Sequence, residues 1–562
     1  MKILGFNAYI HDTAAALLVD GELAAFAEEE RLIREKHTTR FPKKAIEFCL
    51  QQTGTTIDEI DAVAFYWDPG EGMLQRIGQT LLHFPGSLRP LVKQQLGNFR
   101  NMGTVEKRFR ETYRFDGPFH FVSHYCAHAA HAGFGSPFAT CAIMVVDGNG
   151  EIGTTWFGRL NEEGRLQKFH EILYPHSIGL VWCAITEYLG FTQNCDEGKV
   201  MGLSAYGTDR LVDEIRKIFV YDGGLDYRVD LSYFDYHKSR RRWFSPKFEA
   251  IFGPSRMRSG PILAHHYDVA RALQTVTEEM LLALSKALLI ESSEQDLAYT
   301  GGVALNCVAN GRLLFESGAR KLFIPPAAYD AGAAEGAARY VYHMLQGNND
   351  RHPFTTAYLG PEYDDASIEQ ALQNAGLPYH RSDDPFAETA KHLAAGKIVG
   401  WYQGRLEAGP RALGNRSILA DPRSPNMKAH VNDRVKHREG FRPFGPSVLK
   451  HRADEIFVTN GADSPHMLLA FDVRENWREK IPAVVHVDHT ARIQTVEKSV
   501  NPRYTALLEA FENETTVPVV LNTSFNVMGQ PIVDTPRDAV ECFLSTGIDV
   551  LCIGDFICEK QQ

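Results

Sequence analysis

One pattern of strands and loops occurs twice, once at the N-terminus and once after residue 140, and it constrains the fold more than any other feature. The first copy predicts strands over residues 3–9, 13–19 and 22–29, with His11 and Asp12 in its first loop. The second copy predicts strands over 141–146, 152–159 and 165–171, with Asp147 in its first loop. A tight Asp-Gly turn is typical of the hairpin that closes the first copy. The repeat predicts a duplicated α/β fold.

Glycine-rich turns follow two of the predicted strands. Asp147-Gly148-Asn149-Gly150 follows one, and the predicted strand 297–300 leads into Gly301-Gly302, with Asn306 at the start of the next helix. Small residues at a strand-to-helix turn let a nucleotide phosphate approach bare backbone N–H groups. Two ordinary hairpins would explain the loops equally well if either stood alone. Together they favour a nucleotide site that includes Gly301, Gly302 and Asn306.

Four residues have the character of metal ligands. His124 and His128 lie four apart in an alanine-rich segment that begins after Ser123, so a helix would place both imidazoles on one face. Asp147 follows a predicted strand, and Asp330 ends the run 323–330 before a predicted Gly- and Ala-rich helix at 331–344. Two imidazoles and two carboxylates suit iron, manganese or zinc better than a thiolate-preferring ion. The alternative is a helix that is simply rich in histidine, because this segment also contains His131.

Charge and cysteine content limit the partners. The 59 Lys and Arg against 70 Asp and Glu give a net charge of −11, which disfavours nucleic acid or an anionic membrane as the main partner. Nine cysteines without a C-x-x-C pair indicate reduced, mostly buried thiols. No apolar stretch reaches the roughly 18–20 residues that a membrane span needs, and no secretory signal is visible. We therefore expect a cytoplasmic protein.

Residues 405–442 break this acidic trend. They contain nine Lys and Arg against four acids, a net charge of +5. Arg411 and Arg416 lie in a Gly- and Pro-punctuated stretch that we predict to be a loop, and Lys436 and Arg442 follow. An arginine fork matches phosphate oxygens, and lysine adds a point charge. A solvated basic face is the alternative, but such faces favour Glu and Lys at helical spacing. The block predicts a pocket for a small, multiply charged phosphate.

The residues of the first half resemble a known family. The H-x-x-x-H segment, the Asp-Gly-Asn-Gly loop, residues 301–306, Tyr329-Asp330 and the segment DEGKVMGL at 196–203 look like the metal–ATP domain of the NodU/CmcH-type O-carbamoyltransferases. That domain is shared with the tRNA threonylcarbamoyl-transfer metalloproteins and, more distantly, with sugar kinases and actin. The resemblance implies a duplicated ribonuclease-H-like domain. It also implies iron(II) on His124, His128, Asp147 and Asp330, with manganese or zinc as alternatives, and a nucleotide beside Asp196 and Lys199.

The second half carries the more specific resemblance. GPRALGNRSILADPR at 409–423, VKHREGFRPF at 435–444 and LNTSFN at 521–526 are similar to the C-terminal α+β YrdC-like domain of the same enzymes, which binds carbamoyl phosphate and ATP. Asn522 and Ser524 would supply neutral donors there. The chain has Leu406 and Ala408 where the family often has Met and Phe, which puts the shape of one pocket wall in doubt. We expect domains at 1–345 and 356–562, joined by a linker at 346–355.

The resemblance implies an activity. The chain would move a carbamoyl group from carbamoyl phosphate, through carbamoyl-adenylate made with ATP and magnesium, to a hydroxyl of a natural product or sugar. Arg411, Lys436 and Arg442 would neutralise phosphate charge, and His11 would position or deprotonate the acceptor hydroxyl. A tRNA threonylcarbamoyl enzyme and a non-catalytic nucleotide-binding module stay open as alternatives, as does a homodimer. The acceptor and the native metal are beyond the sequence, although acceptor contacts are expected within residues 73–113 and 240–258.

Overall fold

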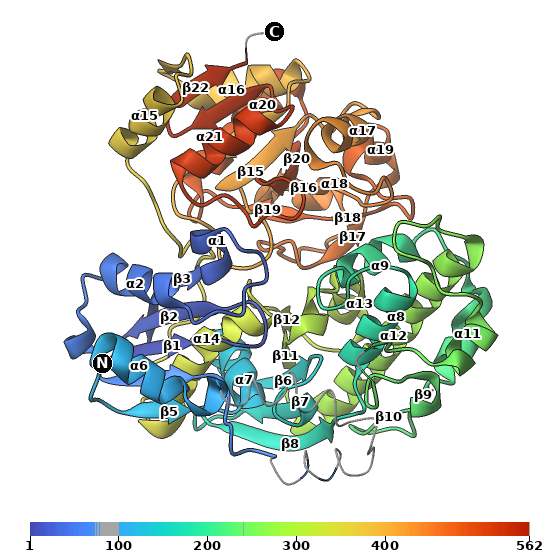
Figure 1. Ribbon diagram of the computed structural model, residues 1–562. Helices are drawn as coiled ribbons and strands as arrows, with labels where there is room; N and C mark the ends of the chain where they lie inside the picture. Colours follow the sequence, from blue (N-terminus) through green and yellow to red (C-terminus); the bar gives the residue numbers. More distant parts are fainter. Residues whose placement is uncertain (73–74, 76–77, 79–100, 240, 561–562) are drawn as a thin grey trace. The chain divides into compact units, whose positions relative to one another are not determined.

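The computed structural model describes residues 1–72, 75, 78, 101–239 and 241–560 (Figure 1). Contacts divide the chain into two compact units. The first comprises Met1–Glu29 and His37–Phe354, and the second comprises Glu30–Lys36 and Thr355–Gln562. Much of the expected acceptor region at 73–113, and residue 240, lie outside the described residues.

Two five-stranded sheets form the frame of the first unit. One sheet has the order β3-β2-β1-β4-β5, and its strands are Glu22–Glu28, Ala14–Val19, Lys2–Phe6, Ala62–Phe65 and Phe119–Phe121. The other has the order β8-β7-β6-β11-β12, and its strands are Leu166–Leu173, Gly153–Leu160, Cys141–Val146, Asp296–Thr300 and Lys321–Phe323.

The two sheets have the same topology. In each, three consecutive strands form an antiparallel meander, the first strand of the meander pairs in parallel with a later strand, and that strand pairs in parallel with another. The predicted repeat is therefore confirmed, and the first unit is a duplicated ribonuclease-H-like α/β domain. Of the later parallel strands, β11 was predicted at 297–300, whereas β4, β5 and β12 come from segments that the hairpin signals did not reveal.

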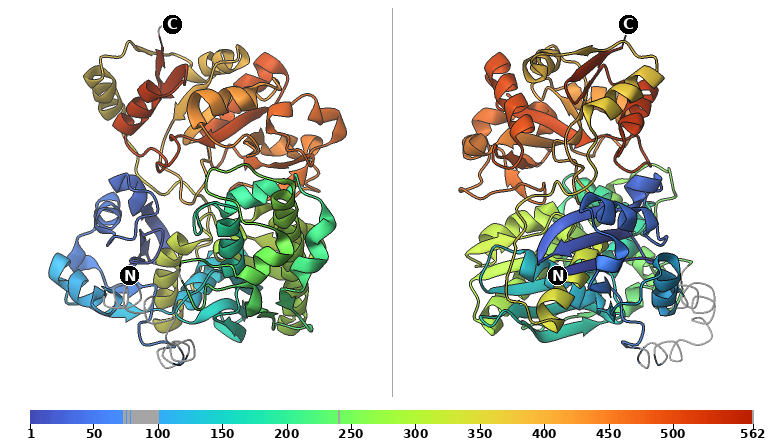
Figure 2. Two further views of the ribbon diagram at one scale, coloured as in Figure 1. Left: turned by 45° about the vertical axis from the view of Figure 1, so that its right-hand side comes forward. Right: turned by 90° about the vertical axis from the view of Figure 1, so that its left-hand side faces the viewer.

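Two helices join the halves. Helix α7 (His124–Gly135) packs on β6, β7 and β11, while α14 (Asp330–Arg339) packs on β1, β2 and β4, and the two helices pack against each other (Figures 1 and 2). The layers therefore run sheet, helix, helix, sheet. Alanine and glycine at half of the positions of α7 and at most positions of α14 allow this close approach, since an added Cβ on Gly336 would lie 1.9 Å from the carbonyl oxygen of Ala127.

Further helices flank the second half of this unit. The longest, α12 (Ala264–Ser292), packs on α9 (Glu197–Ser204), α10 (Val212–Arg216) and α13 (Cys307–Glu316), and α8 (Ile178–Tyr188) packs on α9 and α12. Helix α2 (Lys43–Gln52) covers β2 and β3 of the other half, and α6 (Val105–Tyr113) precedes β5. No helix of the described ranges is long and apolar enough to cross a membrane.

The second unit is α+β. Its eight-stranded mixed sheet has the order β13-β22-β21-β14-β15-β20-β16-β19, with strands His380–Arg381, Phe556–Glu559, Val550–Ile553, Val399–Tyr402, Arg416–Ala420, Val519–Ser524, Gly445–Leu449 and Gln494–Val496. A two-stranded sheet joins β17 (Ala470–Asp472) to β18 (Thr490–Arg492). The main helices are α15 (Asp365–Asn374), α16 (Pro385–Ala394), α20 (Pro502–Thr515) and α21 (Pro536–Ser545).

A short segment from the N-terminal half belongs to this second unit. Residues Glu30–Lys36 include most of α1 (Glu29–Ile33), and the Arg31 guanidinium donates hydrogen bonds to the carbonyl oxygens of Glu407 and Gly409. Arg34 donates to the carbonyl of Ile532 and forms an ion pair of 3.5 Å with Asp538. The predicted boundaries at 345 and 356 did not include this excursion, because nothing local in the segment indicates it.

Candidate functional site

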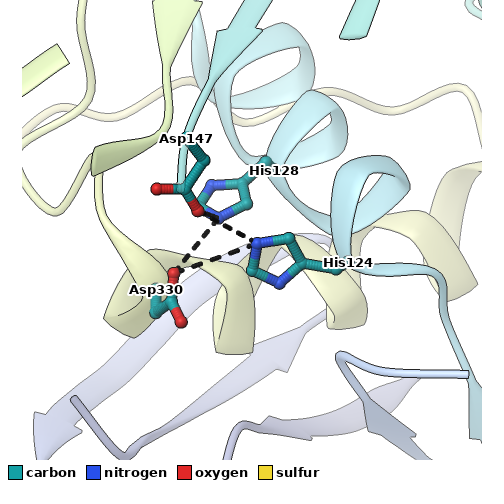
Figure 3. Close-up of side chains that lie close together, drawn as sticks. All are labelled: His124, His128, Asp147 and Asp330. Atoms are coloured by element: carbon teal, nitrogen blue, oxygen red, sulfur yellow. Dashed lines mark hydrogen bonds and ion pairs between the residues drawn. The ribbon is translucent and has the colours of Figure 1, made fainter. Parts of the chain in front are cut away.

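The four predicted metal ligands are brought together by three elements of the first unit (Figure 3). His124 and His128 lie on consecutive turns of α7, Asp147 follows β6, and Asp330 is the first residue of α14. The predicted helix after Ser123 is present, although the Ser123 side chain makes no capping hydrogen bond. The group therefore lies where the two halves of the repeat meet.

The ligand atoms converge on a small volume. One ligand atom from each residue lies within 4.8 Å of the others. The His124 Nε2 atom is 3.1 Å from Asp147 Oδ2 and 3.9 Å from Asp330 Oδ1, and the His128 Nε2 atom is 3.7 Å from each of the same two oxygens (Figure 3). Both imidazoles are almost completely buried. The arrangement has the convergence that one cation requires.

The two imidazoles of this group differ in their contacts, because that of His124 lies within hydrogen-bond distance of Asp147 and that of His128 does not. Neither ring nitrogen of the buried His128 has a hydrogen-bond partner within the described part of the chain. Burial and the neighbouring His124 lower the pKa of His128, which favours the neutral imidazole that binds metals. Burial opposes ionisation of Asp147, but the two histidines outweigh it and hold the Asp147 pKa below its usual range. A buried neutral imidazole and a buried carboxylate are suitable ligands for a transition metal.

His124 is oriented by a residue that the sequence did not single out. The Glu151 carboxylate accepts the backbone N–H of His124 at 3.0 Å and that of Asp68 at 2.8 Å. A carboxylate at the first turn also complements the dipole of α7. Burial raises the pKa of Glu151 to about 7. Glu151 directly follows the predicted glycine loop, but its contact with the helix was not visible in the sequence.

The glycine pair predicted to bind a nucleotide also positions a metal ligand. The Gly302 N–H donates to Asp147 Oδ1 at 2.9 Å. Gly301 has a φ of +95°, and an added Cβ there would lie 2.3 Å from the carbonyl oxygen of Val146. Only glycine fits this backbone and this close approach. The pair holds the Asp147 carboxylate in place, and its nucleotide contact stays a prediction.

We expect Gly302→Ala to weaken metal binding. The added Cβ would lie 2.7 Å from Asp147 Oδ1, so the carboxylate must move away from the other ligands. Disturbing a group that orients a metal ligand typically lowers metal affinity by about 10- to 100-fold. Metal content of the purified variant is the measurement, and Gly198→Ala, whose Cβ meets nothing within 4 Å, is the control. Wild-type metal content in Gly302→Ala would contradict this role for Gly302.

His11 lies in the loop after β1, close to the metal group. Burial disfavours its charged form, but the Asp12 carboxylate beside it outweighs burial and raises the pKa of His11 to about 9, with a contribution from Asp330. A protonated imidazole donates a hydrogen bond and does not remove a proton. Of the two predicted roles, this electrostatic setting favours positioning of the acceptor.

Asn7 ties this loop to the metal group and was not predicted. Its side-chain amide donates to the carbonyl oxygens of Asp12 at 2.9 Å and Asp330 at 3.1 Å. Its carboxamide oxygen accepts the N–H of Ala14. The contact joins residues 323 apart in sequence, so no local pattern could reveal it.

The remaining predicted nucleotide residues have structural contacts of their own. Asp196 is the N-cap residue of α9 and forms an ion pair of 3.0 Å with Lys199. The Asn306 side chain caps α13 by accepting the N–H of Ala309, and it exchanges hydrogen bonds with Gln274. Each of these residues lies at the beginning of a helix, where N–H groups point outward. Their contact with a nucleotide is a proposal.

In the second unit, a buried carboxylate shapes the glycine-rich loop. One oxygen of Glu407 accepts the N–H groups of Leu413, Asn415 and Arg416 at 2.8–3.0 Å. Three hydrogen bonds to one carboxylate fix the path of the chain between β14 and β15. From the sequence, Glu407 was treated only as one of the four acids within residues 405–442, because a charge pattern does not show which backbone groups a carboxylate contacts.

The position and contacts of Arg416 differ from those that the sequence predicted. It is the first residue of β15 and not part of the loop, and its side chain is fully buried. Its guanidinium lies 3.7 Å from the centre of the Tyr402 ring and donates to the carbonyl oxygens of Gln403, Gly404 and Pro361. The fork that was predicted to meet phosphate is thus engaged with the backbone. The Arg416 guanidinium therefore stabilises the backbone around it. Arg411 is half-buried in the loop before β15.

Lys436 and Ser524 are brought together. The Lys436 ammonium donates to the backbone oxygen of Ser524 and lies 3.3 Å from its hydroxyl, and it contacts Asn526 Oδ1 at 2.8 Å. Burial first, and then the charge of Arg438, lower the pKa of Lys436 well below its ordinary value, and Arg442 adds to the effect. The partners of this buried ammonium are neutral oxygens, and the charges of Arg438 and Arg442 that act on it are positive. Such a cluster favours an anion.

Asn522 lies deeper in the same sheet. Its amide donates to the carbonyl oxygen of Ala412, to Ser447 and to Gln494, at 3.0–3.2 Å, and the residue is buried. These contacts hold the glycine-rich loop against β20. A direct donor role of Asn522 toward the carbamoyl group stays a prediction.

Three known proteins show what this chain is similar to. An uncharacterized Synechocystis protein is 39% identical over 99% of this chain and 96% of its own length. The nodulation protein NolNO of Sinorhizobium fredii is 36% identical over 99% of this chain and 80% of its own length. A solved activator of 2-hydroxyisocaproyl-CoA dehydratase from Clostridium difficile, with bound ADPNP, covers 63% of this chain and all of its own at 13% identity, with a TM-score of 0.33.

Two family models match the chain in order. The model described as carbamoyltransferase N-terminus matches residues 2–339, and the model described as carbamoyltransferase C-terminus matches residues 390–560. The first covers the unit that holds the His and Asp group, and the second covers the unit that holds Lys436 and Ser524. The chain therefore belongs to the carbamoyltransferase family and is a transferase.

Proposed function

We propose that this carbamoyltransferase moves a carbamoyl group from carbamoyl phosphate, through carbamoyl-adenylate made with ATP and magnesium, to a hydroxyl of a small molecule. The observation that carries the proposal is the buried Lys436, whose partners are neutral oxygens and whose charged neighbours are Arg438 and Arg442. A phosphate group placed there would supply the missing negative charge. The chemistry needs such a site, because a carbamate is a poor electrophile until it carries a phosphate-type leaving group.

The adenylate chemistry is assigned to the second unit. Lys436 would neutralise phosphate charge, Ser524 would offer a hydroxyl donor beside it, and Arg411 would add a guanidinium fork from the loop that Glu407 holds. Arg442 adds to the positive field. Arg416 would act indirectly, by fixing the backbone of residues 403–404.

Carbamoyl transfer is assigned to the first unit. His124, His128, Asp147 and Asp330 would hold one metal ion, and the nitrogen and oxygen donor set suits iron(II), with manganese or zinc as alternatives. When bound, the metal would supply Lewis-acid character and orient phosphate oxygens. His11 would orient the acceptor hydroxyl from the neighbouring loop. Asp196, Lys199, Gly301, Gly302 and Asn306 would border the nucleotide.

The acceptor is proposed to be a natural product, such as an antibiotic, or a sugar. A mass screen tests this proposal directly. The full chain is incubated with carbamoyl phosphate, ATP, magnesium and iron(II), and candidate alcohols are examined for a gain of about 43 Da, the mass added when a carbamoyl group replaces hydrogen. An ATP-dependent gain on an alcohol supports the proposal. ATP turnover without any such product, together with retention of tRNA by the protein in a filter-binding assay, would favour the tRNA-modifying alternative.

A further inference from the structure

Two arginines of the segment Glu30–Lys36 contact the backbone of the second unit, to which this segment belongs. Arg31 is 2% exposed, and its two terminal nitrogens donate to the carbonyl oxygens of Glu407 and Gly409. These carbonyls lie in the loop between β14 and β15, which also carries Arg411, a residue of the proposed phosphate site. A guanidinium that bridges two carbonyl oxygens fixes their relative position, because its donors have a rigid, planar geometry. Arg31 therefore fixes the part of the loop that leads to Arg411.

The part of this loop that follows Arg411 is held by the sheet of the second unit. Ala412 is the next residue, and its carbonyl oxygen accepts a hydrogen bond from the Asn522 amide at 3.2 Å. On the other side of Arg411, the carbonyl oxygen of Gly409 is held by Arg31, which lies 378 positions earlier in the sequence. Arg411 thus lies between two fixed points of the backbone. Loss of either point should change the direction in which its guanidinium approaches a phosphate.

Arg34 holds a second loop, which is connected to Lys436. The Lys436 ammonium lies 2.8 Å from Asn526 Oδ1, and the Asn526 amide donates to the carbonyl oxygen of Gln530 at 2.8 Å. The Arg34 guanidinium donates to the carbonyl oxygens of the next two residues, 531–532. The same short segment therefore fixes the backbone beside a second cation of the proposed phosphate site.

The segment also adds positive charge to this site. Lys36 is the last residue of the segment, and it is exposed. Burial has the largest effect on the pKa of Lys436 and lowers it, and the charges of Arg438, Arg442 and Lys36 lower it further. Lys36 is thus close enough to Lys436 for its charge to act there, and a positive charge in that position attracts an anion.

We propose that Arg31 and Arg34 are positioning residues of the carbamoyl phosphate site, so that the segment Glu30–Lys36 is a required part of that site. The inference rests on the proposed function. Arg31 sets the approach of Arg411 to the phosphate, and Arg34 sets the loop that contacts Lys436. Neither arginine needs to touch the substrate, because misplacement of a binding group by about 1 Å can by itself cost about 100-fold in rate.

Kinetics with varied carbamoyl phosphate separate positioning from a purely structural role. Phosphate release from carbamoyl phosphate with ATP is measured on the full chain as wild type, Arg31→Gln and Arg31→Lys. The KM for carbamoyl phosphate should rise about tenfold or more in Arg31→Gln, because losing one charge-assisted contact to phosphate corresponds to about 10- to 150-fold in affinity. Arg31→Lys should show a smaller rise, since lysine keeps the charge but cannot bridge two carbonyl oxygens.

Arg351→Gln is the matched control. Arg351 also donates to backbone carbonyl oxygens, those of Phe138 and Gly133, but it does so in the first unit, and its loss should leave the KM for carbamoyl phosphate unchanged. A purely structural role of Arg31 would lower kcat through loss of folded protein and leave KM unchanged, and this result would overturn the inference alone. If Arg31→Gln does not fold, Arg31→Lys gives the decisive KM. Wild type that releases no phosphate would overturn the proposed function, and the inference with it.

A double-mutant cycle tests whether Arg31 acts through Arg411. Arg411→Gln is measured alone and together with Arg31→Gln. If Arg31 only positions Arg411, its loss changes nothing further once the Arg411 guanidinium is absent, so the double variant should match Arg411→Gln in KM within about twofold. The pair Arg34→Gln and Lys436→Met should behave in the same way. Independent losses, in which the two increases in KM multiply, would overturn the positioning role of the arginine concerned.

Discussion

Replacing His128 with alanine should remove the bound metal and abolish carbamoyl transfer, while carbamoyl-adenylate formation continues. His128 is buried, and its Nε2 atom lies 3.7 Å from both Asp147 and Asp330. Without it, two carboxylates and one imidazole are left to hold the ion. Since even indirect damage to a ligand lowers metal affinity about 10- to 100-fold, we expect a loss of at least about 100-fold in transfer. Metal analysis and a transfer assay on one preparation provide the measurement.

The neighbouring His131 is the matched control. It lies on the same helix and is equally buried, but its ring contacts Glu335 and the carbonyl oxygen of Ala327. His131→Gln should keep its metal whatever it costs in stability. If His128→Ala matches wild type in both metal content and transfer, the four residues are not the metal site. If it also loses adenylate formation, the variant is misfolded, and a thermal melt would show this.

Local spacing was enough to predict the histidine pair and Asp147, whereas the resemblance supported the complete set with Asp330. The four-residue spacing of His124 and His128 needs only a helix to place both rings on one face, and α7 provides it. Asp147 was predicted from a strand followed by a glycine loop, and β6 ends one residue before it. These signals act over fewer than ten residues, so they do not depend on tertiary structure. The duplicated meander was predictable for the same reason.

The supporting contacts were not predictable, because they join distant segments. Asn7 contacts Asp330 across 323 residues, and Gly302 holds Asp147 across 155. No periodicity or motif connects residues at such separations. Only the packing of the two halves brings them together.

Arg416 illustrates a second limit of prediction from the sequence. A charged residue in a glycine-rich stretch is normally exposed, and the sequence pattern therefore predicted a phosphate ligand. The structure instead satisfies its guanidinium with backbone carbonyls and the face of Tyr402. Whether a cation binds a ligand or its own backbone depends on the path of the loop, and that path is set by the buried Glu407. Charge counts along the sequence do not contain this information.

Replacing Lys436 with methionine should weaken the use of carbamoyl phosphate by roughly 10- to 150-fold and spare transfer from chemically prepared carbamoyl-adenylate. Methionine keeps the length and the apolar stem but loses the charge. Losing one charge-assisted contact to phosphate costs about 1.5–3 kcal/mol, and this corresponds to roughly 10- to 150-fold in affinity. The paired measurement is phosphate release from carbamoyl phosphate with ATP, and transfer from the pre-made adenylate.

This prediction is informative because phosphate release should fall while transfer from the pre-made adenylate is kept. Lys436 and the metal group belong to different units. Lys450→Met is the control, since Lys450 pairs with Asp463 and Glu497 at the surface of the same unit and should change neither reaction. Loss of phosphate release alone places the first chemistry at Lys436. Equal losses in both assays would mean a single shared site or a misfolded variant. Unchanged phosphate release would make the buried lysine structural, and the anion site would then have to be rebuilt around Arg411 and Arg442.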